Sequence, residues 1–587
     1  MQALSFNRRF FPATLALFFL LPLSLARADE TTLARHILEH AGLNRGLCAV
    51  LGADDSLPLK LAAQSELLVH VREPSNASVQ KLRALAAKAG LPIQRLAIEH
   101  GGFTPLPYAT NTVDLVVHTR AGEDLAEELP LAEVLRVLRP GGVALIGTAD
   151  QAEAADRLAA ILAQWAEPIE DPVLGKDTHG TWLQLRKPPL EGVDEWSHWE
   201  KSPDNNPVSN DAVIVAPYMS QFMATPYYIG MPAITTAAGG RTFLAVGHIA
   251  HHEREWDMLN RLIARNGYNG IVLWERDLPE GYLVHRSAFI ATPETFHLMN
   301  GDHALLLDAA TGAEKGVVRI PSLTGQWKWM ARSEGVLYVL AGEPGPGAEL
   351  VKGNRAMGGW SWADLSKGYY GDRIPHGFGD TLAAYDLEAR KVLWTQREES
   401  LIDARGLAIA DGRFLLYCPD KHLRALDQHT GETLWTLDDA DTLSLIEEPG
   451  KGLKSTPGWR TQTLIVATPE ALVIQGQTRM NVIAISPENG RFLWKKKKIT
   501  NNPNALFIEG NIVVGVGPGG SNVALDPVSG EVVENLNFTK RACTRLTAST
   551  DSLFTRGEGM TRFDLATRKV TVDGTVRPGC NDGVIPA

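Results

Sequence analysis

Apolar runs alternate with amphipathic stretches over roughly the first third of the chain. Four short runs have the length and composition of buried strands, at residues 47–51, 67–71, 113–117 and 143–146. Between them, residues 78–89 and 129–138 place apolar side chains at helical spacing. Strands that alternate with helices are typical of right-handed crossovers, so this pattern predicts an α/β domain built on a parallel sheet.

Beyond residue 189 the helical spacing fades, and a repeating unit of about 40 residues replaces it. The clearest copies are Ala-Leu-Asp-Gln-His-Thr-Gly-Glu-Thr-Leu-Trp at 425–435 and Ala-Ile-Ser-Pro-Glu-Asn-Gly-Arg-Phe-Leu-Trp at 484–494. Counting the weaker copies, the turn residue of each unit stands at 266, 308, 386, 427, 486, 526 and 564. An insertion rich in Gly, Trp and Tyr interrupts the series at about 353–380.

The repeat has a direct physical interpretation. Asp opens a tight turn, the Gly four residues later supplies a positive φ, and the strand that follows ends on a Trp that packs between neighbouring sheets. Four-stranded units of about 40 residues predict a β-propeller. The repeats account for seven blades, and an eighth blade would form if the segment after Val193 paired with the C-terminus. A β-sandwich is the alternative.

Composition limits the classes of function. The 587 residues include 44% hydrophobic and 21% charged residues, which are values of a globular protein. The net charge of −11 disfavours nonspecific binding to nucleic acid, which needs a basic face. Four cysteines are too few for a disulfide scaffold.

The N-terminus has the features of an export signal. Arg8 and Arg9 precede an apolar stretch from Phe10 to Leu25, and Ala26-Arg27-Ala28 fits a small-x-small cleavage site. An uncleaved anchor is the alternative, although the apolar stretch is short for a span. We expect a signal peptide at 1–28, an α/β domain at 29–188, a propeller at 189–587, and a periplasmic or secreted protein without a membrane span in its mature part.

The α/β domain resembles the class I methyltransferase fold over about 40–150. The resemblance rests on the run 107–117, and on residues 133–146 with their Pro140-Gly141-Gly142 turn, which match the family's fourth strand, helix and fifth strand. It implies S-adenosylmethionine as cofactor. By the resemblance, Gly52 would lie in the turn against the cofactor, and Glu73 would hold the ribose hydroxyls.

Two features of this domain favour a degenerate cofactor site. The turn after the first strand has a single glycine, Gly52, where the family has a Gly-x-Gly type, and Gly102 stands where the family often has an acid near the adenine. In addition, S-adenosylmethionine is a cytoplasmic metabolite, which an exported domain seldom meets. An active methyltransferase is the alternative, and no catalytic residue is assigned.

The repeats resemble the quinoprotein alcohol dehydrogenase-like propellers, named for pyrroloquinoline quinone. That resemblance implies quinone and calcium as cofactors, but the family's vicinal cysteine pair is missing, because Cys48, Cys418, Cys543 and Cys580 are all isolated. The combined layout is similar to exported bacterial proteins of planctomycete type. We expect a binding or scaffold module for a protein or polysaccharide, with a quinone-dependent dehydrogenase as the alternative.

The densest polar and aromatic cluster follows residue 193. It includes His198, Asp204, Asn205 and Asn206, which suit a base or ligand and contacts to calcium or sugar at the mouth of the propeller. The alternative is a linker between the domains that is capped by Asx turns.

Two further groups are candidates for ligand binding. His248 and His251 belong to a His- and Glu-rich stretch whose spacing matches no defined metal motif, so no metal site is predicted. Trp360 and Trp362 lie in the insertion, where they suit stacking against sugars, whereas Trp327 and Trp329 also suit packing between blades. Cys543 and Cys580 are a possible disulfide outside the cytoplasm.

Overall fold

A computed structural model describes most of the chain. Its described residues form two compact units: the first comprises most of 30–187, and the second comprises 188–587 together with 108–113 and 139–141. The described residues are 30–53, 55–120, 129, 131–148, 154–163, 169–224, 231–249, 253–279, 282–321, 323–344, 377–453, 463–476, 478–479, 481–497, 499, 505–515, 520–540, 544–579 and 583–587. Each unit is taken by itself below. Among the described residues, no helix combines the length and apolar character needed to cross a bilayer.

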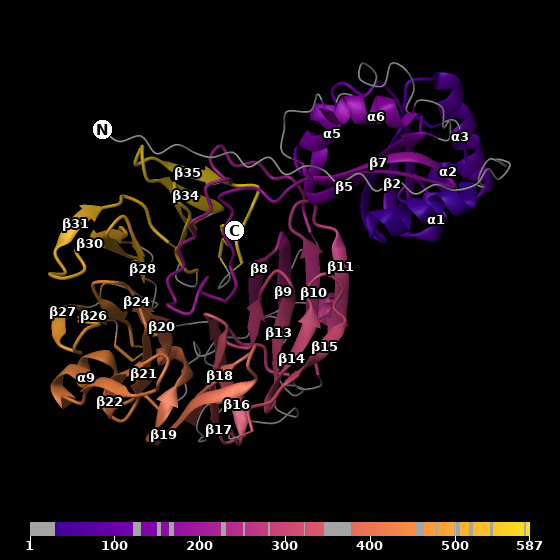
Figure 1. Ribbon diagram of the computed structural model, residues 1–587. Helices are drawn as coiled ribbons and strands as arrows, with labels where there is room; N and C mark the ends of the chain where they lie inside the picture. The colour runs from indigo at the N-terminus through magenta and orange to yellow at the C-terminus, as the bar shows by residue number, and fades with distance from the viewer. Residues whose placement is uncertain are drawn as a thin grey trace, which may run out of the picture. The chain divides into compact units, whose positions relative to one another are not determined.

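The first unit is a seven-stranded sheet flanked by helices (Figure 1). Its strands are β1 (Arg45–Leu51), β2 (Glu66–Glu73), β3 (Leu96–His100), β4 (Val113–His118), β5 (Leu138–Thr148), β6 (Glu170–Asp177) and β7 (Gly180–Arg186). Its helices are α1 (Glu30–Ala41), α2 (Leu57–Gln64), α3 (Asn76–Lys88), α5 (Leu131–Val137) and α6 (Ala154–Ala163).

The strand order in this sheet is β3-β2-β1-β4-β5-β7-β6. β1 pairs in parallel with β2 and β4, as the alternation of strands and helices predicted. β7 runs antiparallel to both β5 and β6, which differs from the expected parallel sheet. β6 and β7 are joined by a tight hairpin, and such a short connection can only reverse the chain. The core includes Cys48, which is fully buried as an apolar residue.

The second unit consists of seven four-stranded antiparallel sheets, which follow one another around a ring (Figure 1). Blade one comprises β8 (Met231–Ala238), β9 (Arg241–Ile249), β10 (Arg261–Asn266) and β11 (Val272–Asp277), and blade two comprises β12 (Phe289–Ala291), β13 (Thr295–Asn300), β14 (His303–Asp308) and β15 (Glu314–Val318). Blade three comprises β16 (Gln326–Ser333), β17 (Val336–Gly342), β18 (Phe378–Asp386) and β19 (Lys391–Asp403). Blade four comprises β20 (Ala408–Ala410), β21 (Arg413–Cys418), β22 (His422–Asp427) and β23 (Thr433–Leu437).

Blade five comprises β24 (Ile465–Ala467), β25 (Leu472–Ile474), β26 (Asn481–Ile485) and β27 (Phe492–Lys497). Blade six comprises β28 (Ala505–Ile508), β29 (Asn511–Val514), β30 (Val523–Leu525) and β31 (Val532–Asn535), and blade seven comprises β32 (Thr547–Ala548), β33 (Ser552–Arg556), β34 (Met560–Asp564) and β35 (Val570–Asp573). Short helices η1 (Glu253–Met258), η2 (Ala404–Gly406) and α9 (Ala440–Ile446) lie between strands. The predicted propeller is confirmed with seven blades, and the described residues after Val193 form no eighth one.

The repeated turn forms as the sequence predicted. The side chain of Asp427 accepts hydrogen bonds from the backbone N–H groups of His429 and Thr430, at 2.9 and 2.8 Å. Gly431 then adopts a φ of +75°, which lets the chain reverse into β23. The same Asp-based turn recurs at Asp308 and Asp526.

The Trp of one blade packs on the turn glycine of the next blade. The pairs are Trp274 with Gly312, Trp394 with Gly431, Trp435 with Gly490 and Trp494 with Gly530. A β-carbon on any of these glycines would stand 2.5 to 2.8 Å from an indole carbon. Each indole Nε1–H donates to a carbonyl in the same turn, at Ala309, Gln428, Pro487 and Pro527 respectively. The repeat is therefore a joint between blades as well as a turn within one.

Candidate functional site

Gly52 and Glu73 lie side by side at the carboxyl edge of the first sheet. Gly52 directly follows β1 and Glu73 ends β2, and these strands are parallel neighbours. The Gly52 N–H donates to the carbonyl of Arg72 at 2.8 Å, and its φ is +72°. Such an edge of an α/β sheet is where this kind of fold binds its ligands.

The Glu73 carboxylate is buried, with 2% of the residue exposed, and three donors hold it. Oε2 accepts from the Ala53 N–H at 2.8 Å and from Arg120 Nη2 at 2.7 Å. Oε1 accepts from the Ser75 N–H at 2.8 Å. A carboxylate has about four acceptor positions, so little capacity remains for two ribose hydroxyls.

The Arg120 guanidinium also lies directly over Gly52. A β-carbon on Gly52 would stand 2.5 Å from Arg120 Nη2. In the resembling family this bare backbone faces the cofactor. As arranged, the residues at this edge do not fit S-adenosylmethionine, because a cation occupies the space next to Gly52 and uses the acid that would bind the ribose.

A second candidate site lies at the hub of the propeller, where residues 196–207, here called the closing segment, run past the first strand of every blade. Its backbone and side chains hydrogen-bond to seven strands in chain order. The pairs are Trp196 with Ala237 (β8), Ser197 with Ala291 (β12), His198 with Arg332 (β16), Pro203 with Ile409 (β20), Asp204 with Ala467 (β24), Asn206 with Phe507 (β28) and Pro207 with Ala548 (β32). One short stretch thus makes a complete circuit of the ring.

The predicted ligand residues of this segment all bond to blades or to their own turns. Asn205 Nδ2 donates to the carbonyls of Leu407 and Ile465, at 2.8 and 3.0 Å. Asn206 exchanges two side-chain hydrogen bonds with the backbone of Phe507, at 2.9 and 3.1 Å. The Asp204 side chain accepts a hydrogen bond from the Asn206 N–H at 3.0 Å. This contact is an Asx turn, as the alternative interpretation of this stretch as a linker predicted. Burial raises the pKa of Asp204.

His198 accepts a hydrogen bond at Nε2 from the backbone N–H of Arg332, at 3.1 Å. Burial, with smaller contributions from His297 and Arg332, lowers the pKa of His198 to about 3. A neutral imidazole whose Nε2 already accepts a hydrogen bond serves the fold. Its role toward a ligand stays a prediction.

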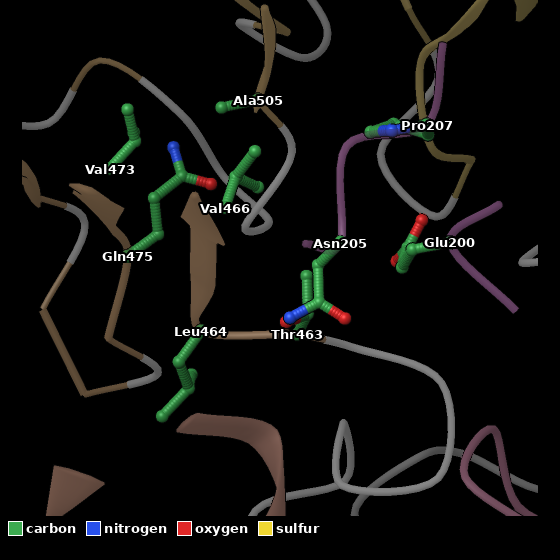
Figure 2. Close-up of a pocket in the computed structure, with 9 residues that line it drawn as sticks. All are labelled: Glu200, Asn205, Pro207, Thr463, Leu464, Val466, Val473, Gln475 and Ala505. Carbon is green, nitrogen blue, oxygen red and sulfur yellow. The ribbon is translucent and has the colours of Figure 1, made fainter. Parts of the chain in front are cut away.

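The pocket beside the closing segment is small (Figure 2). Its lining includes Glu200 and Asn205 from the segment, and Thr463 and Gln475 from the fifth blade and the chain leading into it. The cavity measures about 10 Å³, which is room for a single water. This pocket does not fit a quinone with its calcium ion.

Buried charges surround the hub. Four cations with 7% or less of each residue exposed lie in or just before first strands, namely Arg286, Lys328, Arg405 and Arg545. Arg405 pairs with Asp403, and Arg545 Nη1 lies 3.0 Å from Glu200 Oε2. Burial lowers the pKa of Arg286 to about 10 and that of Lys328 to about 8. The Arg545–Glu200 pair joins the closing segment to the last blade, whereas the Arg405–Asp403 pair is local to the entry of β20.

Comparisons with known families agree with this division. A model of the methyltransferase domain matches residues 51–146, and a model of the outer membrane protein assembly factor BamB matches residues 372–506. The front unit has a methyltransferase fold. The rear unit is a seven-bladed propeller of the BamB-like repeat type. No curated protein matches the chain.

Solved structures give the same two similarities. BamB from Moraxella catarrhalis is 16% identical, with 54% of this chain and 76% of that chain covered and a TM-score of 0.34. A putative S-adenosyl-L-methionine-dependent methyltransferase from Methanococcus maripaludis is 20% identical, covering 28% and 87%, with a TM-score of 0.23. Quinohemoprotein alcohol dehydrogenase from Comamonas testosteroni is 10% identical, with 63% of this chain and 72% of that chain covered and a TM-score of 0.39.

The remaining predicted residues are either outside the described part of the chain or buried between blades. His248 is in β9, but its side chain is outside the described part, as are His251, Trp360, Trp362, Cys543 and Cys580. Trp327 and Trp329 are described, with 1% and 3% exposed, so they pack between blades. Stacking against sugars, the other role that the sequence left open for these two tryptophans, would need exposed rings.

Sequence reasoning missed Arg120 and the hub cations. Arg120 stands just after β4, and only its proximity to Glu73, 47 positions earlier, gives it significance. Arg286, Lys328, Arg405 and Arg545 are each isolated in the sequence, where a single charge is normally taken as exposed. No local signal marks them. The recurrence of a cation near the start of a first strand was visible only with the blades aligned.

Proposed function

We propose that this protein is an exported binding or scaffold protein, in which the propeller engages another protein and the methyltransferase-like unit has lost its cofactor. The observation that carries the second part is the Arg120–Glu73 ion pair over Gly52. Export is part of the proposal because residues 1–28 have the composition of a signal peptide.

A binding role for the propeller is supported by its closed hub and by an exposed apolar run. Val213, Ile214, Val215, Met219, Phe222 and Met223 are each exposed by 37% or more. Asp551 holds this run in place by accepting hydrogen bonds from Tyr218 Oη, at 2.8 Å, and from the Ala216 N–H, at 3.3 Å. Clustered apolar side chains that are held on a surface are typical of protein interaction sites.

This run borders a groove of about 230 Å³ lined by Ile214, Met219, Phe554 and Val576 among others. Most of the lining is apolar and includes Met560 as a second methionine, while Asp211 and Asp573 are among its few polar members. A mainly apolar groove with methionines suits a protein partner better than a polysaccharide. The BamB description names an assembly factor, and a role in protein assembly outside the cytoplasm is consistent with such a surface.

For the first unit we expect no saturable binding of S-adenosylmethionine up to about 1 mM, measured by isothermal titration calorimetry on the full chain. Arg120 blocks the Gly52 backbone and uses Glu73, so both main contacts are lost. Arg120→Ala tests this cause, because its removal would expose both. Micromolar binding by the wild type that Glu73→Gln abolishes would refute the loss of cofactor.

For the propeller we expect a photo-crosslinking residue at position 219 to form one discrete adduct with a protein in the native host. Met219 is 87% exposed at the centre of the apolar run. A matched control is position 532, where Val532 is 50% exposed on the outer strand β31. Equal labelling at both positions, or none at 219, would argue against a protein partner at this surface.

A further inference from the structure

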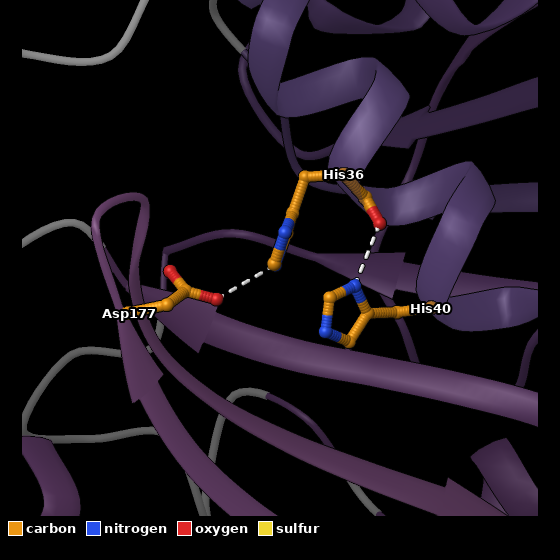
Figure 3. Close-up of side chains that lie close together, drawn as sticks. All are labelled: His36, His40 and Asp177. Atoms are coloured by element: carbon orange, nitrogen blue, oxygen red, sulfur yellow. Dashed lines mark hydrogen bonds and ion pairs between the residues drawn. The ribbon is translucent and has the colours of Figure 1, made fainter. Parts of the chain in front are cut away.

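A group of histidines and one aspartate lies in the first unit, away from Gly52 and Glu73 in the sequence. His36 and His40 are four positions apart on α1, so both imidazoles project from one face of the helix. Asp177 ends β6, and His179 follows in the turn to β7. Figure 3 shows His36 and His40 facing Asp177 across the space between helix and hairpin.

The spacing of the three side chains fits a small metal ion. His36 Nε2 lies 3.0 Å from Asp177 Oδ2, and one ligand atom from each of His36, His40 and Asp177 lies within 4.8 Å of the others. Ligands bound tetrahedrally to Zn²⁺ at about 2.0–2.1 Å are separated by about 3.3–3.4 Å. Small side-chain rotations therefore bring all three atoms onto one ion.

The outer contacts of these residues leave the coordinating atoms available. His40 Nδ1 lies 3.0 Å from the carbonyl oxygen of His36, so it must donate, and Nε2 then keeps its lone pair. Asp177 Oδ1 accepts from the His179 N–H at 2.7 Å, which leaves Oδ2 for the ion. Metal ligands in proteins are commonly oriented by bonds of this kind.

His179 offers a fourth nitrogen next to the three ligands. Its ring centroid lies 4.7 Å from that of His36. Its Nδ1 is buried and has no hydrogen-bond partner, which is an unfavourable state that coordination would relieve. Imidazole with one carboxylate is a ligand set that suits Zn²⁺ and related ions.

We propose that His36, His40 and Asp177 bind a divalent transition metal of the Zn²⁺ type, with His179 available as a fourth ligand. The ion would join α1 to the β6–β7 hairpin. His40 and Asp177 stand 137 positions apart in the chain, so the site would act as a cross-link within the first unit.

A second group of potential ligands, Glu398, Cys418 and His422 in the propeller, is less suited. Arg424 Nη1 already holds the Glu398 carboxylate at 2.6 Å. A cation at this position competes with a metal ion. Burial also raises the pKa of the Cys418 thiol to about 12, whereas the thiolate is the form that binds metal.

The test is a titration of the chelator-treated full chain, without a histidine tag, with Co²⁺ and then Zn²⁺. We expect one equivalent of Co²⁺ to give visible absorption bands of a low-symmetry site, and Zn²⁺ to displace it with micromolar or tighter affinity. His36→Ala and Asp177→Ala should each weaken binding at least tenfold. His100→Ala, which removes an exposed histidine of the same unit, should leave it unchanged.

A second readout separates lost binding from lost folding. Zn²⁺ should raise the melting temperature of the wild type and of His100→Ala, but not that of His36→Ala, whose circular dichroism spectrum should match the wild type. Binding weaker than about 100 µM, or binding that survives His36→Ala and disappears in His251→Ala, would overturn the proposal. The latter result would assign the metal to the histidine-rich stretch at 248–252.

Discussion

Gly490→Ala is expected to destabilise the propeller far more than Gly510→Ala, although both glycines have a φ of +73°. A β-carbon at Gly510 meets nothing within 4 Å, so this variant reports only the strain of a positive φ, about 1–2 kcal/mol. At Gly490 the new carbon would stand 2.5 Å from Trp435 Cε3, which adds an overpacking cost of about 1–3 kcal/mol.

The cause can be isolated with Trp435→Ala. This variant removes the indole and its hydrogen bond to the Pro487 carbonyl, with an expected loss of about 3–5 kcal/mol. In that background Gly490→Ala should cost no more than Gly510→Ala does, because the clash is gone. Denaturant unfolding followed by far-UV circular dichroism measures all four variants. If Gly490→Ala and Gly510→Ala lowered the free energy of unfolding of the wild type equally, the Trp435 indole would be able to move away from the new β-carbon without loss of stability.

The same joint explains why the repeat is uneven. β15 and β31 carry no Trp, and the turns that follow in the next blades have Arg390 and Arg568 where the others have Gly. Both arginines adopt a positive φ, of 53° and 57°. At these two joints the turn accepts a side chain because no indole lies against it. The first blade differs, because β35 has no Trp but Gly270 is kept, and a β-carbon there would stand 2.4 Å from the Phe222 ring.

Local patterns in the sequence were sufficient for the two folds. The apolar runs predicted β1, β2, β4 and β5, and the Asp, Gly and Trp positions predicted the blades, because each signal depends on residues close together in the chain. The short strands of the seventh blade were also covered, through the turn at Asp564. The antiparallel β6–β7 pair was missed because its residues lack a long apolar run.

The sites were harder to predict because their contacts cross the chain. The cluster that includes His198 and Asn205 was noticed for its polarity, but its partners Arg332 and Ile465 lie 134 and 260 positions away. The residue type alone does not distinguish a polar side chain that binds a ligand from one that bonds to a distant part of the backbone. The spacing of His36 and His40 was a local signal, yet its meaning depended on Asp177.

Arg545→Met is expected to lower the free energy of unfolding of the propeller by about 3–5 kcal/mol, because it leaves Glu200 buried without its partner. The guanidinium carbon of Arg545 also lies 3.8 Å from the centre of the Trp199 ring. Arg545 precedes β32 in the last blade, and Glu200 belongs to the closing segment, which meets β8 through Trp196. This ion pair therefore helps to close the ring without any covalent connection.

A double substitution separates the ion pair from packing. Glu200→Gln in the Arg545→Met background removes the buried charge, so the double variant should recover part of the lost stability. Arg397→Met is the control, because Arg397 is 77% exposed in its pair with Asp380 and should cost less than about 1 kcal/mol. Denaturant unfolding gives these values, and hydrogen exchange locates the effect. If Arg545→Met opened no amides in β32–β35, the hydrogen bonds of the closing segment alone would be sufficient to hold the last blade against the first.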